Sequence, residues 1–344
     1  MKISAKEILV HGGLFVATFL TCMISGVAWG NHDFTDIQNI SYGLEYAILV
    51  LTFLGAHEFG HYFASRAHGV DATLPYFIPM PPFGDGMPFF GTFGAVIKTR
   101  NAIPDRRALF DIGVAGPLAG FVMCFAFLIV GFLTLPGPEY IFQLHPEYLT
   151  EYGGAIPTIG LHFGDTLLYS GLAALFGQFV AWVPPMNELY HFPLLNVGWF
   201  GLFVTSMNML PIGQLDGGHV VYAMFGSKQK KVARLFWKLL VAIGILSLTS
   251  IVWELLQTDE PNSIVQFLRT NLLPALDYIR IHLPFVFQLW PGWLLWALIT
   301  RFFIKLDHPD IYDERPLGRA RRILGWIAIA ILVLSFSPNG IYIN

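Results

Sequence analysis

The sequence predicts an all-α polytopic membrane protein with about seven transmembrane helices and a small membrane-associated β-hairpin. Of its 344 residues, 55% are hydrophobic and 12% are charged, whereas soluble domains carry about 25% charged residues. Aromatic residues make up 15% of the chain, including 31 phenylalanines. The formal net charge of −3 gives no reason to expect a nucleic-acid partner. Composition therefore predicts the lipid bilayer as a partner.

The predicted spans are long apolar runs. They are 8–30, 43–66, 109–135, 192–224, 235–256, 284–303 and 323–337. The first run begins like a signal peptide, but its length and lack of a small-residue cleavage pattern favour a retained span. A weaker run at 163–183 is ambiguous, and we expect it to lie in the interface rather than to cross.

The basic residues predict the orientation of these spans. With seven spans and the N-terminus inside, 18 of the 20 Lys and Arg residues fall in cytoplasmic segments, and only Arg269 and Arg280 fall outside. This distribution follows the positive-inside rule. An additional span at 163–183 would place the later basic loops on the outside.

The two cysteines, Cys22 and Cys124, both lie within apolar runs. We expect buried, small apolar side chains. A disulfide would require both residues to meet at one depth, and a zinc site built from cysteine would need more thiols.

The first motif with chemical content is GAHEFGHY at 55–62. In a helix, His57 and His61 are four residues apart and present two nitrogens to one cation. Glu58 could accept a proton from water at that cation. Two histidines and a carboxylate are costly at membrane depth. That cost favours a metal site over a chance match or a proton or ion path.

A third ligand must come from elsewhere in the chain. We expect His68, seven residues after His61, to be a loop histidine at the cytoplasmic end of the helix. The better candidate is Asp216, the only carboxylate in 189–253, within NMLPIGQLDGG at 208–218. A buried charge in such an apolar stretch indicates function.

Four residues in this second motif predict a break in the helix. They are Pro211, Gly213, Gly217 and Gly218. Irregular backbone at membrane depth must line a cavity or be buried in protein. A kinked helix with a structural aspartate is the alternative, but it leaves the buried charge unexplained.

With these two motifs the chain resembles the site-2 protease family, the intramembrane zinc metalloproteases of the peptidase M50 type. The resemblance rests on HEFGH at 57–61 and on NMLPIGQLDGG at 208–218, which follows the family pattern N-x-x-P-x-x-x-L-D-G. It extends to AGPLAG at 115–120 and FFGTFGAVI at 89–97, and it covers the interval 43–224. The paired motifs are far more specific than either alone.

The resemblance implies one zinc ion per chain. His57, His61 and Asp216 would hold the zinc, and Glu58 would activate water. Asn208 would hold substrate or stabilise the oxyanion.

The region 71–107 is too rich in Pro and Gly for a plain helix. PFFGTFGAVIK predicts a strand near the membrane surface, and GDGMP before it predicts a turn. The family implies a membrane-associated hairpin here, and an exposed strand could accept an extended substrate as its neighbour. A structural loop is the alternative. The residues we expect to bind substrate are Gly91, Thr92, Phe93 and Gly94.

Two further sets of residues receive structural interpretations. Gly116 and Gly120 have the G-x-x-x-G spacing that allows close helix packing, which we expect beside the helix of the first motif. The remaining histidines near predicted boundaries are each expected to be surface or interfacial, and His219 lies only three residues from Asp216. They are His145, His162, His191, His219 and His282.

We expect one membrane domain in three parts. Residues 1–42 form an accessory helix and an outside loop, 43–226 form the catalytic core, and 227–344 form C-terminal accessory helices. The outside loop at 136–191 is too short and irregular for the PDZ domain of many bacterial relatives. This loop predicts the PDZ-lacking type, and we also expect no CBS-like tail.

The predicted function is intramembrane zinc metalloendopeptidase, cleaving in or near the transmembrane segments of other proteins, as in regulated intramembrane proteolysis. The predicted partners are transmembrane protein substrates and the bilayer. The expected location is a prokaryotic plasma membrane, with the N-terminus cytoplasmic and the active site toward the cytoplasm. The alternatives are a metal-binding transporter or channel, which usually shows internal repeats, and an inactive helix-binding scaffold of the same fold.

Overall fold

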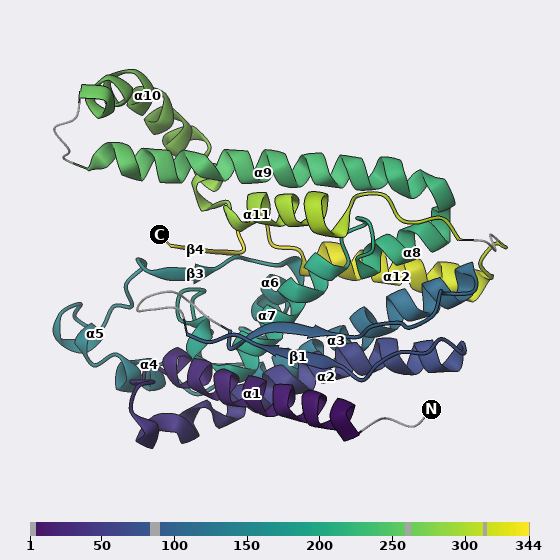
Figure 1. Ribbon diagram of the computed structural model, residues 1–344. Helices are drawn as coiled ribbons and strands as arrows, with labels where there is room; N and C mark the ends of the chain where they lie inside the picture. The colour runs from purple at the N-terminus through teal and green to yellow at the C-terminus, as the bar shows by residue number, and fades with distance from the viewer. Residues whose placement is uncertain (1–4, 83–89, 259–262, 312–314, 344) are drawn as a thin grey trace.

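The computed structural model describes residues 5–82, 90–258, 263–311 and 315–343, and most of these residues are helical (Figure 1). The longer helices are α1 (Ala5–Trp29), α2 (Leu44–Ala67), α3 (Arg106–Leu133), α7 (Pro193–Asn208), α9 (Gln229–Gln257), α10 (Ser263–His282) and α12 (Arg319–Ser335). Shorter helices are α4 (Glu139–Leu144), α5 (Glu147–Thr150), α6 (Leu167–Phe176), α8 (Asp216–Phe225) and α11 (Gly292–Ile299). Short 3₁₀ segments are η1 (Ile37–Gly43), η2 (Leu189–His191), η3 (Gly226–Lys228) and η4 (Pro284–Gln288), and η5 (Thr300–Ile304) is π-helical. The strands are β1 (Tyr76–Pro79), β2 (Thr92–Val96), β3 (Leu161–Phe163) and β4 (Ile341–Ile343).

Four helical segments in the described ranges are long and apolar enough to cross a membrane. They are Ala5–Trp29, Ile37–Ala67, Arg106–Leu133 and Asp216–Gln257, the last of which joins α8, η3 and α9. The other predicted spans correspond to shorter helices, α7, α11 and α12. The count of about seven spans therefore stays a prediction. α6, within the ambiguous run at 163–183, has 10 residues and is too short to cross alone.

The centre of the molecule is a close-packed group of α2, α3 and α7. Close approach depends on small residues: a Cβ at Gly201 of α7 would lie 2.1 Å from the Cys124 Sγ of α3. Cys22 and Cys124 are free and buried, as predicted.

The β1–β2 hairpin is antiparallel, as the sequence predicted. It lies along α1. Near the start of α1, His11 Nδ1 lies 3.0 Å from the Pro75 carbonyl oxygen. Near its end, the ring of Trp29 packs on Phe90 with centroids 5.7 Å apart. The predicted turn at 84–88 falls outside the described residues.

Two elements have no counterpart in the sequence predictions. β3 pairs with β4 in a second antiparallel sheet that joins residues far apart in the chain. α10 contains no buried residue and lies with α9 on the side of the molecule opposite α1 (Figure 1).

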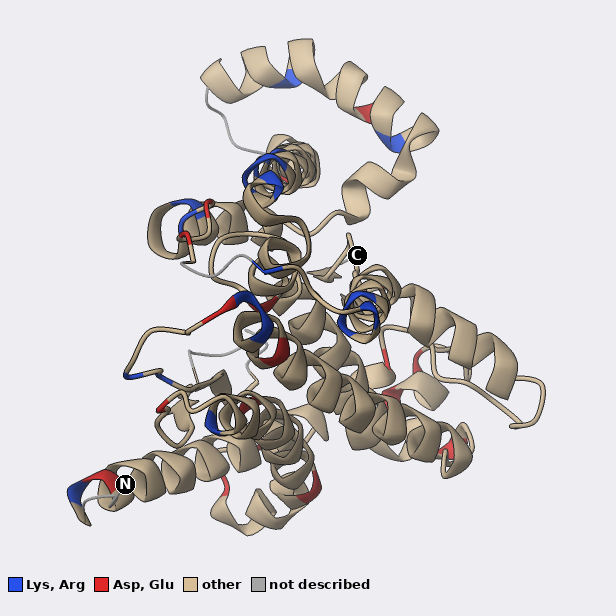
Figure 2. Cartoon of the chain, turned by 90° about the vertical axis from the view of Figure 1, so that its right-hand side faces the viewer, with Lys and Arg blue, Asp and Glu red and all other residues tan. Residues whose placement is uncertain are grey.

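Basic residues gather at one end of the molecule. Figure 2 looks onto the end where α3, α9 and α12 begin, and the blue colour of Lys and Arg residues marks the first turns of these helices. α2 ends there with Arg66 in its last turn. The structure thus brings together the basic segments that the sequence assigned to the cytoplasmic side.

Candidate metal centre

Three predicted ligands meet at the point where α2 faces the start of α8. His57 and His61 share one face of α2, and their Nε2 atoms lie 3.1 Å apart. Asp216 is the first residue of α8, and its Oδ2 lies 3.3 Å from each of these nitrogens. Segments separated by more than 150 residues therefore place three ligand atoms around one point.

The hydrogen bonds around this group suit a cation. The Nδ1 of His61 lies 2.7 Å from the carbonyl oxygen of Ile112, which can only accept a hydrogen bond. In the neutral imidazole, Nδ1 then carries the proton and Nε2 carries a free lone pair. That lone pair faces the Asp216 carboxylate, and a metal ion between the two acceptors would satisfy both. Two imidazole nitrogens and a carboxylate oxygen form a donor set that zinc accepts.

The break between α7 and α8 places Asp216. Gly213 has φ of +52°, and its N–H donates to the carbonyl of Leu306 at 2.9 Å. A Cβ at Gly217 would lie 1.9 Å from the Met209 carbonyl oxygen, so α8 begins directly against the broken segment. Pro211 and Gly213 lie within the break, as predicted. Gly217 and Gly218 do not break the helix but lie inside the first turn of α8, so that part of the prediction was wrong.

The glycines of α3 bring that helix against the metal-site helix. A Cβ at Gly116 would lie 2.1 Å from the His61 Nε2, and one at Gly120 would lie 3.2 Å from the His57 Nδ1. The predicted packing role of the G-x-x-x-G spacing is confirmed. It leaves no space for a side chain beside the His61 imidazole and little space beside that of His57.

A cavity of about 350 Å³ opens onto the ligand group. Glu58 lines it together with the three ligands, and its side chain is buried. Asn208, the last residue of α7, also lines it and has its Nδ2 3.5 Å from the His57 Nε2. The predicted catalytic and metal-binding residues therefore share one space.

The hairpin strand reaches this cavity with its last residues and the one that follows them. Ala95, Val96 and Ile97 line the cavity, whereas residues 91–94 do not. Gly91 packs on α1, where a Cβ would lie 2.5 Å from the Cys22 Cα. The 91–94 segment directly precedes Ala95 on the side of the hairpin tip, and its predicted role in substrate binding stays a prediction.

Two histidines near the centre were not predicted to take part. His219 lines the cavity, and its Nδ1 lies 2.8 Å from the Nε2 of His308. Its spacing of three residues from Asp216 was a sequence signal, but His308 comes from a distant segment with no local pattern. His68 caps α2 and pairs with Asp111 at 2.8 Å, away from the ligand group, as predicted.

Helices of membrane-spanning length that enclose a His, His, Asp group beside a glutamate define a helical membrane metalloprotein. The sequence profile described as Peptidase family M50 matches residues 45–251. The chain belongs to this family.

Curated relatives of the chain are also named as proteases. One is the "Probable zinc metalloprotease EGY2, chloroplastic" of Oryza sativa subsp. indica, which is 29% identical over 220 residues, covering 63% of this chain and 35% of the relative. Another is the "Probable zinc metalloprotease EGY1, chloroplastic" of Arabidopsis thaliana, 34% identical over 177 residues, covering 52% of this chain and 29% of the relative. The chain thus spans about a third of the length of these relatives. No solved structure matches it. Because these relatives are chloroplastic plant proteins, they give no support to the predicted prokaryotic plasma membrane.

Proposed function

We propose that the chain is a membrane-embedded zinc metalloendopeptidase that cleaves peptide bonds in or near the membrane-spanning segments of other proteins. The observation that carries this proposal is the meeting of His57, His61 and Asp216 around one point, with Glu58 in the same cavity. Membership of peptidase family M50 and the names of the relatives support it.

The residues divide into ligands and proton carriers. His57, His61 and Asp216 would hold the zinc, which supplies Lewis acidity toward water and the scissile carbonyl. Glu58 would accept the proton of the attacking water and deliver it to the leaving amine. Asn208, an amide beside the His57 imidazole, would donate a hydrogen bond to the carbonyl oxygen of the substrate.

The substrate would bind in an extended form beside β2. A transmembrane helix hides its peptide bonds, so it must unwind before hydrolysis. β2 pairs with β1 along one edge, and its last residues and Ile97 line the cavity next to Glu58. A substrate strand added to the second edge would present its carbonyl groups to the centre.

The decisive variant is Glu58→Gln in the detergent-purified full chain. It removes the proton acceptor but keeps the side-chain shape, so cleavage of a membrane-protein substrate should fall by about 10²- to 10⁴-fold. Zinc content should remain unchanged. Glu254→Gln, at an exposed position of α9, is the matched control and should cleave normally. Cleavage at a normal rate by Glu58→Gln would disprove this mechanism.

The second variant, Asp216→Ala, tests the ligand group. We expect it to lose about one zinc ion per chain, together with cleavage. Full retention of zinc would remove Asp216 as a ligand. If the wild type binds zinc and the variants change that binding, yet no peptide bond is ever cleaved, the result would favour the transporter or the scaffold.

A further inference from the structure

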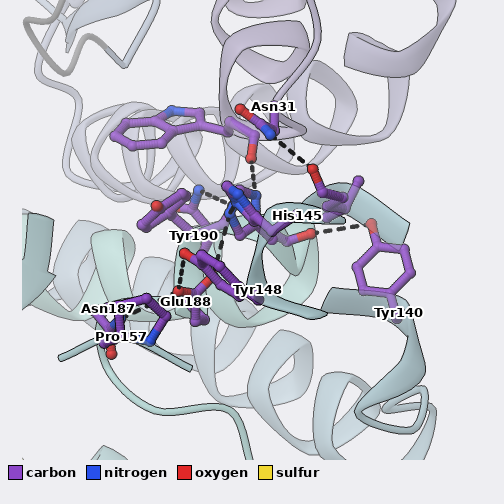
Figure 3. Close-up of polar contacts among 12 residues, drawn as sticks. Asn31, Tyr140, His145, Tyr148, Pro157, Asn187, Glu188 and Tyr190 are labelled. Carbon is purple, nitrogen blue, oxygen red and sulfur yellow. Dashed lines mark hydrogen bonds and ion pairs between the residues drawn. The ribbon is translucent and has the colours of Figure 1, made fainter. Parts of the chain in front are cut away.

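A second group of potential ligands lies at the other end of α7. His145 follows α4, and Glu188 precedes η2, the turn that ends at His191 before α7. Figure 3 labels His145 and Glu188. The Nε2 atoms of His145 and His191 lie 2.9 Å apart, and the Glu188 Oε2 lies 3.4 Å from the His191 Nε2. Among the described residues, this group and the His57 centre are the two sets that could hold a metal ion.

The two groups are separate sites. His191 lies two residues before Pro193, where α7 begins, and Asn208 at the other end of α7 lies beside His57. A helix of 16 residues is about 24 Å long. A ligand of one group therefore cannot serve the other.

The hydrogen bond made by His191 leaves a lone pair directed into the group. Its Nδ1 lies 2.7 Å from the carbonyl oxygen of Trp29, so Nδ1 carries the proton and donates it. The Nε2 is then an acceptor, and it faces the Glu188 Oε2. Two acceptors that face each other repel unless a proton or a metal cation lies between them.

The carboxylate of Glu188 is held with one oxygen engaged and the other free. The Tyr148 hydroxyl donates to Oε1 at 3.0 Å, and the Asn187 Nδ2 donates to the same oxygen at 3.2 Å (Figure 3). Oε2 is buried and has no hydrogen-bond donor in the part of the chain that the structure describes. The side chain of Glu188 is only 1% exposed. A buried, unpaired carboxylate oxygen is costly, and a bound cation would offset that cost.

His145 completes the pattern. Its Nδ1 lies 2.7 Å from the Glu147 Oε1, so the ring can donate to that carboxylate while Nε2 faces the group. Metal-binding histidines usually donate their second nitrogen to a carboxylate or a carbonyl. Both histidines here have such a partner, Glu147 and the Trp29 carbonyl, as His61 has in the first centre.

We propose that His145, Glu188 and His191 bind a zinc ion that is distinct from the ion of the His57 centre. The site links the end of α1, the segment after α4 and the start of α7. It therefore has a structural role, holding these segments together at one end of the bundle. This proposal is independent of the peptidase activity.

A metal-free network is the competing interpretation. In that network a doubly protonated His145 donates to both Glu147 and His191. Such an arrangement leaves the Glu188 Oε2 facing the lone pair of His191 without a donor. It would bind no zinc, so zinc content separates the two interpretations.

The test is the zinc content of the detergent-purified full chain in a set of variants. We expect about two zinc ions per chain in the wild type and about one in Asp216→Ala. His145→Ala and Glu188→Gln, each in the Asp216→Ala background, should bring the content close to zero. His162→Ala, a half-buried histidine elsewhere in the same outside segment, should match the wild type.

The result that would overturn the proposal is unchanged zinc content on His145→Ala and Glu188→Gln in the Asp216→Ala background. A content near zero in Asp216→Ala alone would overturn it equally. If instead Asp216 is not a ligand of the His57 centre, Asp216→Ala will keep all the zinc of the wild type. The two failures are therefore distinguishable. Cobalt(II) titration of Asp216→Ala needs no further substitution: a visible band from bound cobalt supports the site, and its absence contradicts it.

Discussion

Gly116 shows how a residue without a side chain controls the geometry of the metal centre. Its position on α3 leaves only 2.1 Å between an added Cβ and the His61 Nε2. The same helix accepts the hydrogen bond of the His61 Nδ1 at the Ile112 carbonyl. α3 therefore both orients the imidazole and makes room for it.

Gly116→Ala should displace the His61 ring. Because the added carbon would overlap the metal-facing nitrogen, we expect zinc affinity of this centre to fall by about 10-fold or more, and cleavage to fall with it. Gly55→Ala on α2 is the control, since an added Cβ there meets nothing within 4 Å. Zinc titration of both variants measures the effect. Equal affinity in the two would show that α3 yields easily and does not hold His61 in place.

At the scale of residues, sequence reasoning found what local spacing encodes. His57 and His61 follow from helix periodicity, and Asp216 stands out as a charge in an apolar run. His145 and His191 were expected at the surface or the interface, and that prediction was wrong for His191, which is 2% exposed. Their meeting depends on a fold that brings α4 beside the start of α7. The one local signal was the spacing of three residues from Glu188 to His191.

At the scale of elements, the length of apolar runs predicted the helices well, but it did not predict which distant segments pair. The run at 8–30 became α1 (Ala5–Trp29), and the Pro and Gly residues after 208 predicted the break before α8. The β3–β4 pair could not be predicted, because its strands are three residues each and about 180 residues apart. The position of the hairpin along α1 likewise depends on tertiary packing, which no local sequence pattern predicts.

Gly91→Ala tests whether the hairpin positions the substrate. Gly91 has φ of +74°, and an added Cβ would lie 2.5 Å from the Cys22 Cα. Alanine there should shift β2 away from α1 and move Ala95–Ile97 relative to Glu58. Since small misplacements of a substrate are costly, we expect kcat/KM for cleavage to fall by about 10- to 100-fold, with zinc content unchanged.

The control for this variant is Gly12→Ala, on α1 but with open space around the added carbon. It should cleave like the wild type. If Gly91→Ala also cleaves like the wild type, β2 does not place the substrate. If it loses zinc, the hairpin acts on the metal centre and not on the substrate.

At the scale of the whole molecule, the two proposed metal sites lie toward opposite ends. The first is near the basic end: His61 lies six residues before the end of α2, a rise of about 9 Å. The second lies with α4 and η2 at the end away from the basic first turns of α3, α9 and α12 (Figures 1 and 2). This polarity agrees with the orientation that the basic residues predict, in which the first centre is close to the cytoplasm.

The orientation depends on whether α7 and α8 together make one crossing. α7 has 16 residues and α8 has 10, with the break between them, so neither spans a bilayer alone. Two exposed positions flank the pair: Ile159 precedes it and Ser227 follows it. Cys22 and Cys124 are buried and free, so a cysteine introduced at either position would be the main reactive thiol.

We expect an impermeant maleimide to label Ile159→Cys in intact cells, and to label Ser227→Cys only after the membrane is opened. That result would establish a single crossing made of two half-helices, with the irregular segment that carries Asp216 buried within it. Labelling of both variants in intact cells would make α7 and α8 a re-entrant pair that enters and leaves on one side. The later basic segments would then lie outside, and the positive-inside assignment would fail for the C-terminal third of the chain.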